Sequence, residues 1–395
     1  MMYRKFKAEA LFTGDRFLTG GEVLITDKDG RVVEIVDGSA ISDAELFAGT
    51  ICPGFINTHC HLELSWMKGI VPKHSGMIDF LFAVMQTKPA EGQEVKKAMY
   101  VAEAQMVRTG IVAVGDICNT SVTIDIKKDR LLYYHNFIET MGFADSSAPD
   151  RFMKAVQVFN DFATLYPLPV ASNSIVPHAP YSVSKTLFDL ITRFPGNRLL
   201  SIHNQENSAE NEFFLEGSGD FHRLFNAIGV DSSAHKATGK TSLQHYLPWV
   251  LRNQTIILVH NTETGSKDLQ YINSFAAKGV STWMCLCPNA NLYINNKLPD
   301  IRLISENTDR ITLGTDSLAS NDKLDLLEEI KTIYDAYPEI DIQRLLKWGT
   351  MNGAKALDID DEVGSFAPGK QPGIVHIEGL TPSGISKSAK SKRIL

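Results

Sequence analysis

Residues 51–65, ICPGFINTHCHLELS, form the stretch on which the fold prediction depends. The apolar run Ile51–Ile56 leads into His59 and His61, which are separated by one residue. If the chain is extended there, alternate side chains share a face, so both imidazoles point the same way. Two imidazoles at the end of a strand form part of a metal site, because zinc readily binds histidine nitrogen. An isolated His-x-His is also common in surfaces and cores, so the prediction depends on ligands elsewhere in the chain.

The composition places the chain among ordinary globular proteins. It has 395 residues, of which 44% are hydrophobic and 22% are charged. This length predicts one large domain and a smaller one. The formal net charge of −7 argues against a nucleic-acid-binding surface. No apolar run reaches roughly 18 residues, so no membrane crossing is expected. The five scattered cysteines predict no disulfide framework, and a reducing cytoplasm fits best.

From residue 51 onward, short apolar strands alternate with helical patterns. Residues 93–109 place Val95, Met99 and Met106 on one helical face, and Gly110 ends the helix. Eight strands with helices between them predict a (β/α)8 TIM barrel of the α/β class. A doubly wound sheet is the alternative, but the first strand–helix turn lacks Gly-x-Gly-x-x-Gly. After the first strand, which ends at His59, strands are expected at 111–118, 131–139, 169–180, 199–206, 255–262, 279–288 and 310–317.

The two ends of the chain differ in pattern from the middle, because they contain short β-type segments separated by turn residues. Asp29-Gly30 lies between two alternating apolar runs, which is a strong hairpin signal. Residues 363–395 return to short β segments separated by Gly and Pro. Because the termini of a domain often lie close together, we expect both ends to pair into one small β unit. The predicted organisation is a composite β-sandwich from residues 1–50 and 363–395, beside a barrel from residues 51–362.

Polar side chains end several of the predicted strands, at the edge of a barrel where chemistry takes place. The first strand ends at His59 and His61, the fifth at His203 and the eighth at Asp316. Three imidazoles and one carboxylate suit zinc or a similar divalent ion and leave a position open for water. Such an ion would lower the pKa of that water to about 7 and produce a nucleophile. The sequence therefore predicts a metal centre of these four residues.

Other strand-end residues suit proton transfer. Glu206 follows His203 by three residues and is placed to take a proton and pass it to a leaving group. His260, at the end of the sixth strand, would orient the water or polarise the substrate, and its position fits both a metal ligand and a residue that supports one. Asp316 would share the proton traffic, so we predict Glu206, His260 and Asp316 as the catalytic residues. The strand at 169–180 contains neither Lys nor Glu to bridge two ions, which favours a single metal.

Six motifs, quoted at the end of this paragraph, resemble the metal-dependent amidohydrolase superfamily in order and spacing. The resemblance covers nearly the whole chain and is strongest to the mononuclear branch of chlorohydrolases and of cytosine, guanine, adenosine-type and aminofutalosine deaminases. It implies a barrel with a composite β-sandwich, one zinc or iron ion, and hydrolytic removal of ammonia or a similar group from a ring carbon. The motifs are PGFINTHCHLELS, VPHAPYSVS, SIHNQE, LVHNT, LGTDSLASN and GSFAPGK.

The same resemblance suggests residues that contact the substrate. His178 matches a histidine that contacts substrate in several deaminases, and Glu63 lies in a segment similar to that of aminofutalosine-deaminase-like members. Trp66 is placed either to stack on a planar ring or to pack in the first loop. The family's Cys-Pro-x-Ser-Asn has Ala290 in place of its serine here, followed by Asn291. His178, Glu63, Trp66 and Asn291 are therefore the predicted substrate-binding residues.

The predicted function is that of a metal-dependent hydrolase, most simply a deaminase of an amino-substituted N-heterocycle that uses a metal-activated water. One alternative is hydrolysis of another C–N bond or of a C–Cl bond, as in amidases and chlorohydrolases. An alternative of another class is a non-catalytic metal-binding protein. The expected partner is a small-molecule substrate, with no nucleic acid and no membrane. Assembly into a homo-oligomer is left open.

Overall fold

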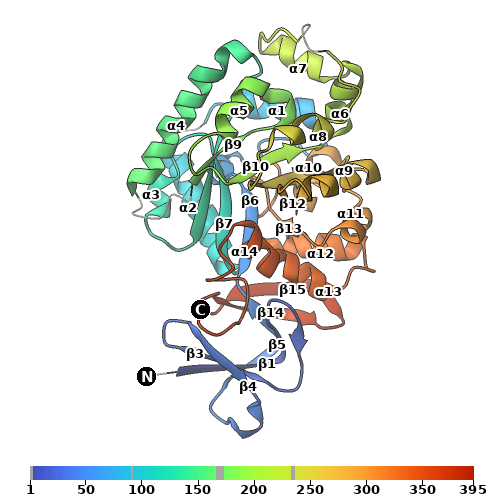
Figure 1. Cartoon of the computed structure of the whole chain (residues 1–395). Helices are drawn as coiled ribbons and strands as arrows, with labels where there is room; N and C mark the ends of the chain where they lie inside the picture. The colour runs from blue at the N-terminus through green and yellow to red at the C-terminus, as the bar shows by residue number, and fades with distance from the viewer. Residues whose placement is uncertain (1–2, 90–91, 166–172, 233–235) are drawn as a thin grey trace.

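The computed structural model describes residues 3–89, 92–165, 173–232 and 236–395. Strands from both ends of the chain form one seven-stranded sheet, at the lower end of the molecule in Figure 1. Its order is β15-β14-β5-β1-β3-β4, with β2 paired to β1. The strands are β1 (Tyr3–Phe12), β2 (Phe17–Leu18), β3 (Val23–Asp27), β4 (Val32–Val36), β5 (Glu45–Pro53), β14 (Ile374–Thr381) and β15 (Gly384–Arg393).

This sheet joins the two ends of the chain as predicted, but it is not confirmed as a sandwich. β14 pairs antiparallel with β5, with Ile374 opposite Pro53, so the C-terminal hairpin extends the N-terminal strands. The predicted hairpin around Asp29-Gly30 is formed by β3 and β4. The described strands of the two ends make a single sheet, whereas a sandwich needs two sheets packed face to face. The domain limits at residues 50 and 363 stay a prediction.

Eight parallel strands make up the larger part of the molecule. They form two four-stranded sheets, in the orders β6-β7-β8-β9 and β10-β11-β12-β13. Every predicted strand has a counterpart, although residues 169–172 of the fourth lie outside the described residues. The strands are β6 (Phe55–Cys60), β7 (Ile111–Cys118), β8 (Tyr133–Thr140), β9 (Asn173–Pro177), β10 (Leu199–Asn204), β11 (Thr255–His260), β12 (Ser281–Leu286) and β13 (Ile311–Leu313).

The two sheets meet at two seams without forming one closed ladder. Between β13 and β6, the backbone N–H groups of Thr315 and Asp316 donate to the His59 carbonyl, at 3.0 and 3.1 Å. Between β9 and β10, the backbone N–H of His203 donates to the His178 carbonyl at 2.9 Å. The predicted closed barrel is therefore present as two adjoining sheets. The physical reason at the first seam is that β13 has only 3 residues, so it reaches β6 only near the strand end.

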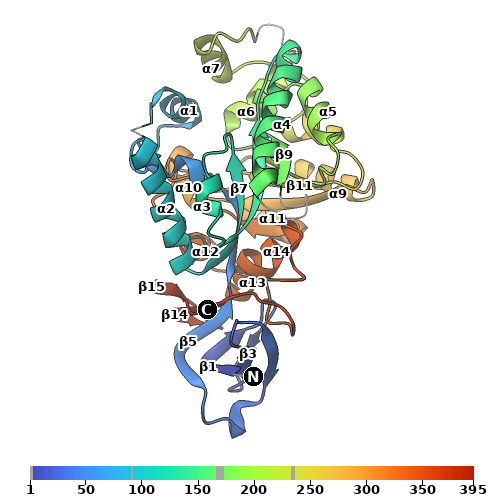
Figure 2. The same cartoon turned by 90° about the vertical axis from the view of Figure 1, so that its left-hand side faces the viewer.

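Helices surround these strands in both views of the molecule (Figures 1 and 2). The predicted amphipathic helix at 93–109 is α2, which buries Met99, Ala102 and Met106 and ends before Gly110, whose φ is 100°. None of the described helices is long and apolar enough to cross a membrane. The helices are α1 (Met77–Gln86), α2 (Gly92–Arg108), α3 (Ile124–Lys127), α4 (Ala148–Leu165), α5 (Lys185–Thr192), α6 (Ser208–Glu216), α7 (Phe221–Ala227), α8 (Ser242–Tyr246), α9 (Ser266–Ala276), α10 (Pro288–Asn295), α11 (Ile301–Asn307), α12 (Leu326–Ala336), α13 (Ile342–Lys347) and α14 (Gly353–Ala356).

A buried ion pair ties α3 to β7 and β8. The Lys127 ammonium lies 2.5 Å from Asp116 Oδ2 and donates to Asn136 Oδ1 at 2.6 Å, and all three side chains are buried. The second carboxylate oxygen, Asp116 Oδ1, accepts the backbone N–H of Leu62 at 2.8 Å. Leu62 directly follows His61 in the sequence. The pair therefore supports the backbone at the end of β6, because a buried charge keeps its geometry only with its partners in place.

We expect replacement of Lys127 by methionine to destabilise the fold by about 3–5 kcal/mol, because it leaves the Asp116 carboxylate buried without its cation. Urea unfolding of Lys127→Met beside the parent protein measures this loss. Lys128→Met is the matched control, since the neighbouring Lys128 pairs with Asp125 at the surface and such pairs contribute little. Equal stability of the two variants would contradict a supporting role for the buried pair.

Candidate metal centre and active site

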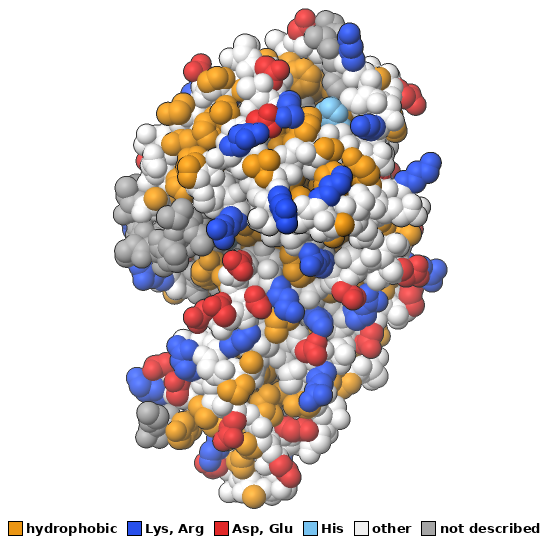
Figure 3. All heavy atoms as spheres, viewed as in Figure 1, with side chains coloured by type: hydrophobic (Ala, Val, Ile, Leu, Met, Phe, Trp, Pro, Cys, Tyr) orange, Lys and Arg blue, Asp and Glu red, His pale blue; other side chains and the backbone are white. Residues whose placement is uncertain are grey.

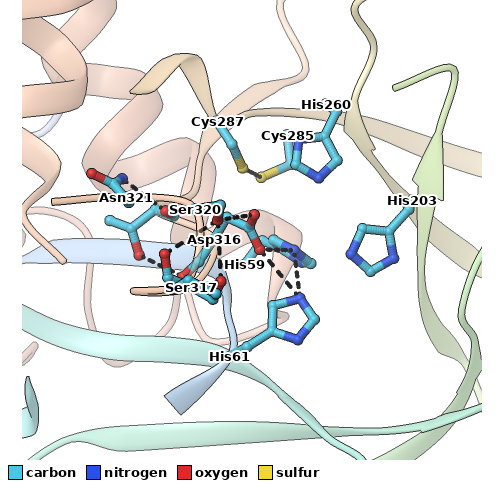
Figure 4. A network of polar contacts seen from close by, with 12 residues as sticks. His59, His61, His203, His260, Cys285, Cys287, Asp316, Ser317, Ser320 and Asn321 are labelled. Atoms are coloured by element: carbon cyan, nitrogen blue, oxygen red, sulfur yellow. Dashed lines mark hydrogen bonds and ion pairs between the residues drawn. The ribbon is translucent and has the colours of Figure 1, made fainter. Parts of the chain in front are cut away.

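Side chains from the ends of β6, β10 and β13 converge on one point, as Figure 4 shows. His59 Nε2 lies 3.2 Å from His61 Nε2. Asp316 Oδ1 lies 3.4 Å from the first of these nitrogens and 3.3 Å from the second. With His203 they form a buried group whose ligand atoms all lie within 4.8 Å of one another. The structure thus brings together the four predicted metal ligands.

The geometry of this group fits a divalent ion. Donor atoms bound about 2.0–2.1 Å from a tetrahedral ion are separated by about 3.3–3.4 Å, close to the separations of 3.2–3.4 Å among His59, His61 and Asp316. Burial lowers the pKa of His61 to about 3, so its imidazole is neutral at pH 7 and keeps a lone pair for a metal. Burial alone would raise the pKa of Asp316, but its hydrogen bond with His59 and the nearby imidazoles hold that pKa well below its usual range. The residues present therefore match an N,N,N,O metal site.

Hydrogen bonds select which atoms face the centre. The Nδ1 of His203 lies 2.8 Å from the His178 carbonyl oxygen. It can only donate to that oxygen, so the proton is on Nδ1 and Nε2 remains for an ion. Ser320 Oγ donates to Asp316 Oδ2 at 2.5 Å, which leaves Asp316 Oδ1 turned toward the histidines. Asp316 adopts φ = 57°, a conformation that costs energy for a residue other than glycine and that is frequent at functional sites.

Glu206 lies beside this centre and is placed to carry a proton. Its carboxyl is buried, with Oε1 3.4 Å from His260 Nε2. Burial raises the pKa of Glu206 well above its usual value, and the charges of Asp316 and Glu210 add to the effect. The Glu206 N–H donates to Glu210 Oε2 at 3.3 Å, and Asn295 Nδ2 donates to the Glu206 carbonyl at 3.3 Å. The backbone contacts fix a carboxyl that holds its proton more readily than a free one.

His260 is held by a residue predicted to bind substrate. His260 Nδ1 lies 2.9 Å from Asn291 Oδ1, and Asn291 Nδ2 in turn donates to Thr262 Oγ1. The Asn291 amide donates its N–H to Thr262, so its oxygen accepts a hydrogen bond from His260 Nδ1. His260 Nε2 is then left with a lone pair facing Glu206. Burial lowers the pKa of His260 to about 4, which keeps the ring neutral. Asn291 therefore orients His260 and is not among the residues that line the cavity described next.

A cavity of about 310 Å³ opens in front of the metal ligands. It is within the size range of small-molecule sites. A larger cavity of about 790 Å³ lies beside the seven-stranded sheet, but no histidine lines it. Chemistry rather than size therefore identifies the candidate active site. The predicted residues that line the smaller cavity are His61, Glu63, His178, His203, Glu206, His260 and Asp316.

Glu63 and Trp66 lie in the short 3-10 helix η2 (Leu62–Met67), but only one of them faces the cavity. The Glu63 carboxylate accepts the backbone N–H groups of Asn119 and Thr120, at 3.1 and 3.3 Å, so it also holds the loop after β7. Trp66 is half-buried and packs against an apolar cluster that includes Met67. Of the two positions predicted for Trp66, the structure shows the packed one, whereas Glu63 stays a candidate for substrate contact.

Glu139, at the end of β8, lines the cavity although it is not among the predicted site residues. Its Oε1 lies 3.6 Å from His203 Nδ1. Burial raises the pKa of Glu139 to about 8, and a hydrogen bond from Asn119 offsets part of this rise. The signal was available, because Glu139 ends the predicted strand 131–139 just as the other site residues end theirs. His178 also faces the cavity, and its Nδ1 lies 2.7 Å from Ser182 Oγ.

Known proteins share both the sequence pattern and the fold. The chain is 23% identical over 343 residues to a 5-methylthioadenosine/S-adenosylhomocysteine deaminase of Teredinibacter turnerae, covering 83% of this chain and 71% of the relative. Aminofutalosine deaminase of Helicobacter pylori, solved in complex with methylthio-coformycin, has a TM-score of 0.81 at 20% identity, covering 99% of this chain and 100% of that one. An adenosine deaminase of Xanthomonas campestris with bound zinc has a TM-score of 0.69 at 18% identity, covering 94% and 84%.

These neighbours fit the TIM-barrel type of architecture that the two parallel sheets indicate, and a family model shows the relationship directly. The model of the amidohydrolase family matches residues 50–394. That range contains the metal-ligand candidates, Glu206 and His260. The chain belongs to the amidohydrolase family.

Proposed function

We propose that this protein is a metal-dependent hydrolytic deaminase that releases ammonia from a ring carbon of an amino-substituted N-heterocycle. The observation that carries the proposal is the convergence of three imidazoles and one carboxylate beside a protonatable Glu206, with His61, His203, Asp316 and Glu206 lining one cavity. Relatives named as deaminases of adenosine-type nucleosides support it and make adenine nucleosides the first substrates to test. Membership of the amidohydrolase family supports the same reaction class.

The residues divide the work of the reaction. A divalent ion held by the four ligands would supply a water of lowered pKa as the nucleophile. The water oxygen bonds to the ring carbon while Glu206 takes one of the water's protons and delivers it to the ring nitrogen. Glu206 then takes the second proton from that oxygen and delivers it to the amine, so that the C–N bond breaks and ammonia leaves. His260, with its Nε2 lone pair 3.4 Å from Glu206 Oε1, accepts a hydrogen bond and orients the attacking oxygen. Asp316 takes part in these proton transfers. The products are the ring carbonyl and ammonia, so water and substrate atoms balance.

We infer zinc as the ion, with iron as the alternative. The donor set of three imidazole nitrogens and one carboxylate oxygen supports zinc, and the Xanthomonas campestris relative was solved with zinc bound. We also propose His178 and Glu63 as substrate contacts, since both line the cavity. Trp66 and Asn291 remain proposals for indirect roles, the first through packing and the second through His260.

Three further proposals concern architecture, location and partners. We propose that the eight parallel strands belong to a closed (β/α)8 barrel with a composite terminal sandwich. We also propose that the protein works in the cytoplasm and that it binds no nucleic acid. Acidic and basic side chains are interspersed on the face shown in Figure 3, and the net charge is −7. This distribution supports a small-molecule partner rather than a polyanion.

Replacement of Glu206 by glutamine is expected to lower kcat by roughly one hundred- to ten-thousand-fold, because the amide cannot transfer the proton. The measurement is ammonia release from adenine nucleosides, aminopurines, aminopyrimidines, triazines and aminofutalosine, with metal content determined in parallel. Glu216→Gln, an exposed change on α6, is the control and should keep the parent rate. Chloride or carboxylate release without ammonia would favour the other hydrolases, and unchanged activity of Glu206→Gln would favour a non-catalytic protein.

Removal of the metal is expected to abolish turnover and to lower the thermal unfolding midpoint, because an ion that binds only the folded state stabilises it. Elemental analysis of the purified protein should give one ion per chain, and Zn²⁺ or Fe²⁺ added after chelation should restore both properties. Asp316→Ala should reduce metal content even in excess Zn²⁺. Full activity of metal-free protein would contradict the proposal.

A further inference from the structure

The catalytic cavity has two chemically different ends. His61, His203, Glu206, His260 and Asp316 form the polar end. The other end is an apolar wall contributed by two helices, α1 and α7. We define this apolar wall by the cavity-lining residues Phe80, Leu81, Val84 and Met85 of α1 and Leu224 and Phe225 of α7. None of these residues belongs to the predicted site, and the proposed chemistry at the metal does not require them.

The two helices of the wall are held to each other. Arg223 Nη1 of α7 lies 2.8 Å from Asp79 Oδ1 of α1, and the guanidinium lies 5.4 Å from the centre of the Phe82 ring. α1 and α7 also contact each other directly. In both views of the molecule they lie at the end opposite the seven-stranded sheet (Figures 1 and 2). The wall is therefore a built part of the cavity and not an accidental apolar patch.

Charge at the cavity has one sign. Among the described residues, no Lys or Arg lines it, whereas Glu63, Glu139, Glu206 and Asp316 do. Arg223 stands beside the wall, but its guanidinium is already paired with Asp79 and with Asp220. A carboxylate on the substrate at this end would lose part of its hydration against the wall and find no cation, which is costly. An uncharged apolar group would instead gain contact with the wall.

The wall is partly open to solvent where a ligand would cover it. Met85 is 51% exposed and Met141, which also lines the cavity, is 40% exposed. Flexible thioether side chains adapt to apolar groups of different shape. Because the wall is continuous with the metal end of the same cavity, one ligand can reach both ends.

We propose that the apolar wall binds an uncharged apolar substituent of the substrate, so that the protein takes amino-heterocycles with such an arm and rejects those whose arm ends in a carboxylate. This inference rests on the proposed function for the orientation of the heterocycle toward the metal. The wall then determines specificity, since both arms present the same reacting ring to the catalytic residues.

The test compares two adenine nucleosides that differ only in the arm on the sugar, one with a butylthio arm and one with that arm ending in a carboxylate. Calorimetry with metal-loaded Glu206→Gln measures binding without turnover, and ammonia release measures kcat/KM of the parent. We expect the butylthio compound to bind at least about tenfold more tightly and to be preferred in kcat/KM by a similar factor. Comparable binding, tighter binding of the carboxylate, or binding of neither compound would overturn the inference.

Charge reversal at the wall provides the second measurement. Met85→Arg, a change at a half-exposed position, is expected to reduce the butylthio preference at least about tenfold by pairing with the carboxylate arm. Met153→Arg on α4, where Met153 is 62% exposed and does not line the cavity, is the matched control and should leave the preference unchanged. Equal effects of the two variants would contradict a role for the wall.

The two proposals fail in different ways. Selective binding of the butylthio arm without ammonia release from either compound would reject deamination and support the wall. Ammonia release at equal kcat/KM from both compounds would support deamination and reject the wall.

Discussion

The seam between β6 and β13 is the contact on which the rest of the site depends. The His59 carbonyl accepts the backbone N–H groups of Thr315 and Asp316. These hydrogen bonds join the first and last parallel strands, which are more than 250 residues apart in the sequence, as the Asn57–Thr315 separation of 258 shows. They place the carboxylate of Asp316 against the imidazoles of His59 and His61. The seam therefore brings His59 and His61 of one sheet against Asp316, which follows the last strand of the other.

The site brings together ionisable groups whose charged forms are disfavoured by burial. His61, His203 and His260 are kept neutral, and Glu206 is driven toward its protonated form. Neutral imidazoles offer lone pairs to a metal, and a protonatable carboxyl beside them serves for transfer. Four non-glycine residues at these strand ends have positive φ, a strain that the surrounding hydrogen bonds maintain. They are Gln205, His260, Asn261 and Asp316.

Supporting contacts give these groups their directions. Hydrogen bonds fix three side-chain orientations. Asn291 orients His260, Ser320 orients Asp316, and the His178 carbonyl orients His203. Below the end of β6, the Lys127–Asp116 pair holds the Leu62 N–H. The cavity that these groups face is lined on its other side by residues of α1 and α7, which carry no part of the proposed chemistry. The proposed chemistry and the proposed substrate selection therefore use different elements of one cavity.

The sequence by itself determined the α/β class and the hairpin of the N-terminal unit, and it predicted which four residues lie together as candidate metal ligands. It did so because parallel strands bring their carboxyl ends to one edge, so that strand-end polar residues such as His203 and Asp316 must meet there. Tertiary structure alone decided that the strands form two sheets, that Trp66 packs away from the cavity and that Asn291 contacts His260. It also decided that Lys127 is buried and that α1 faces α7. Those outcomes depend on the direction of side chains beyond the strand ends and on contacts distant in sequence, which periodicity along the chain does not encode.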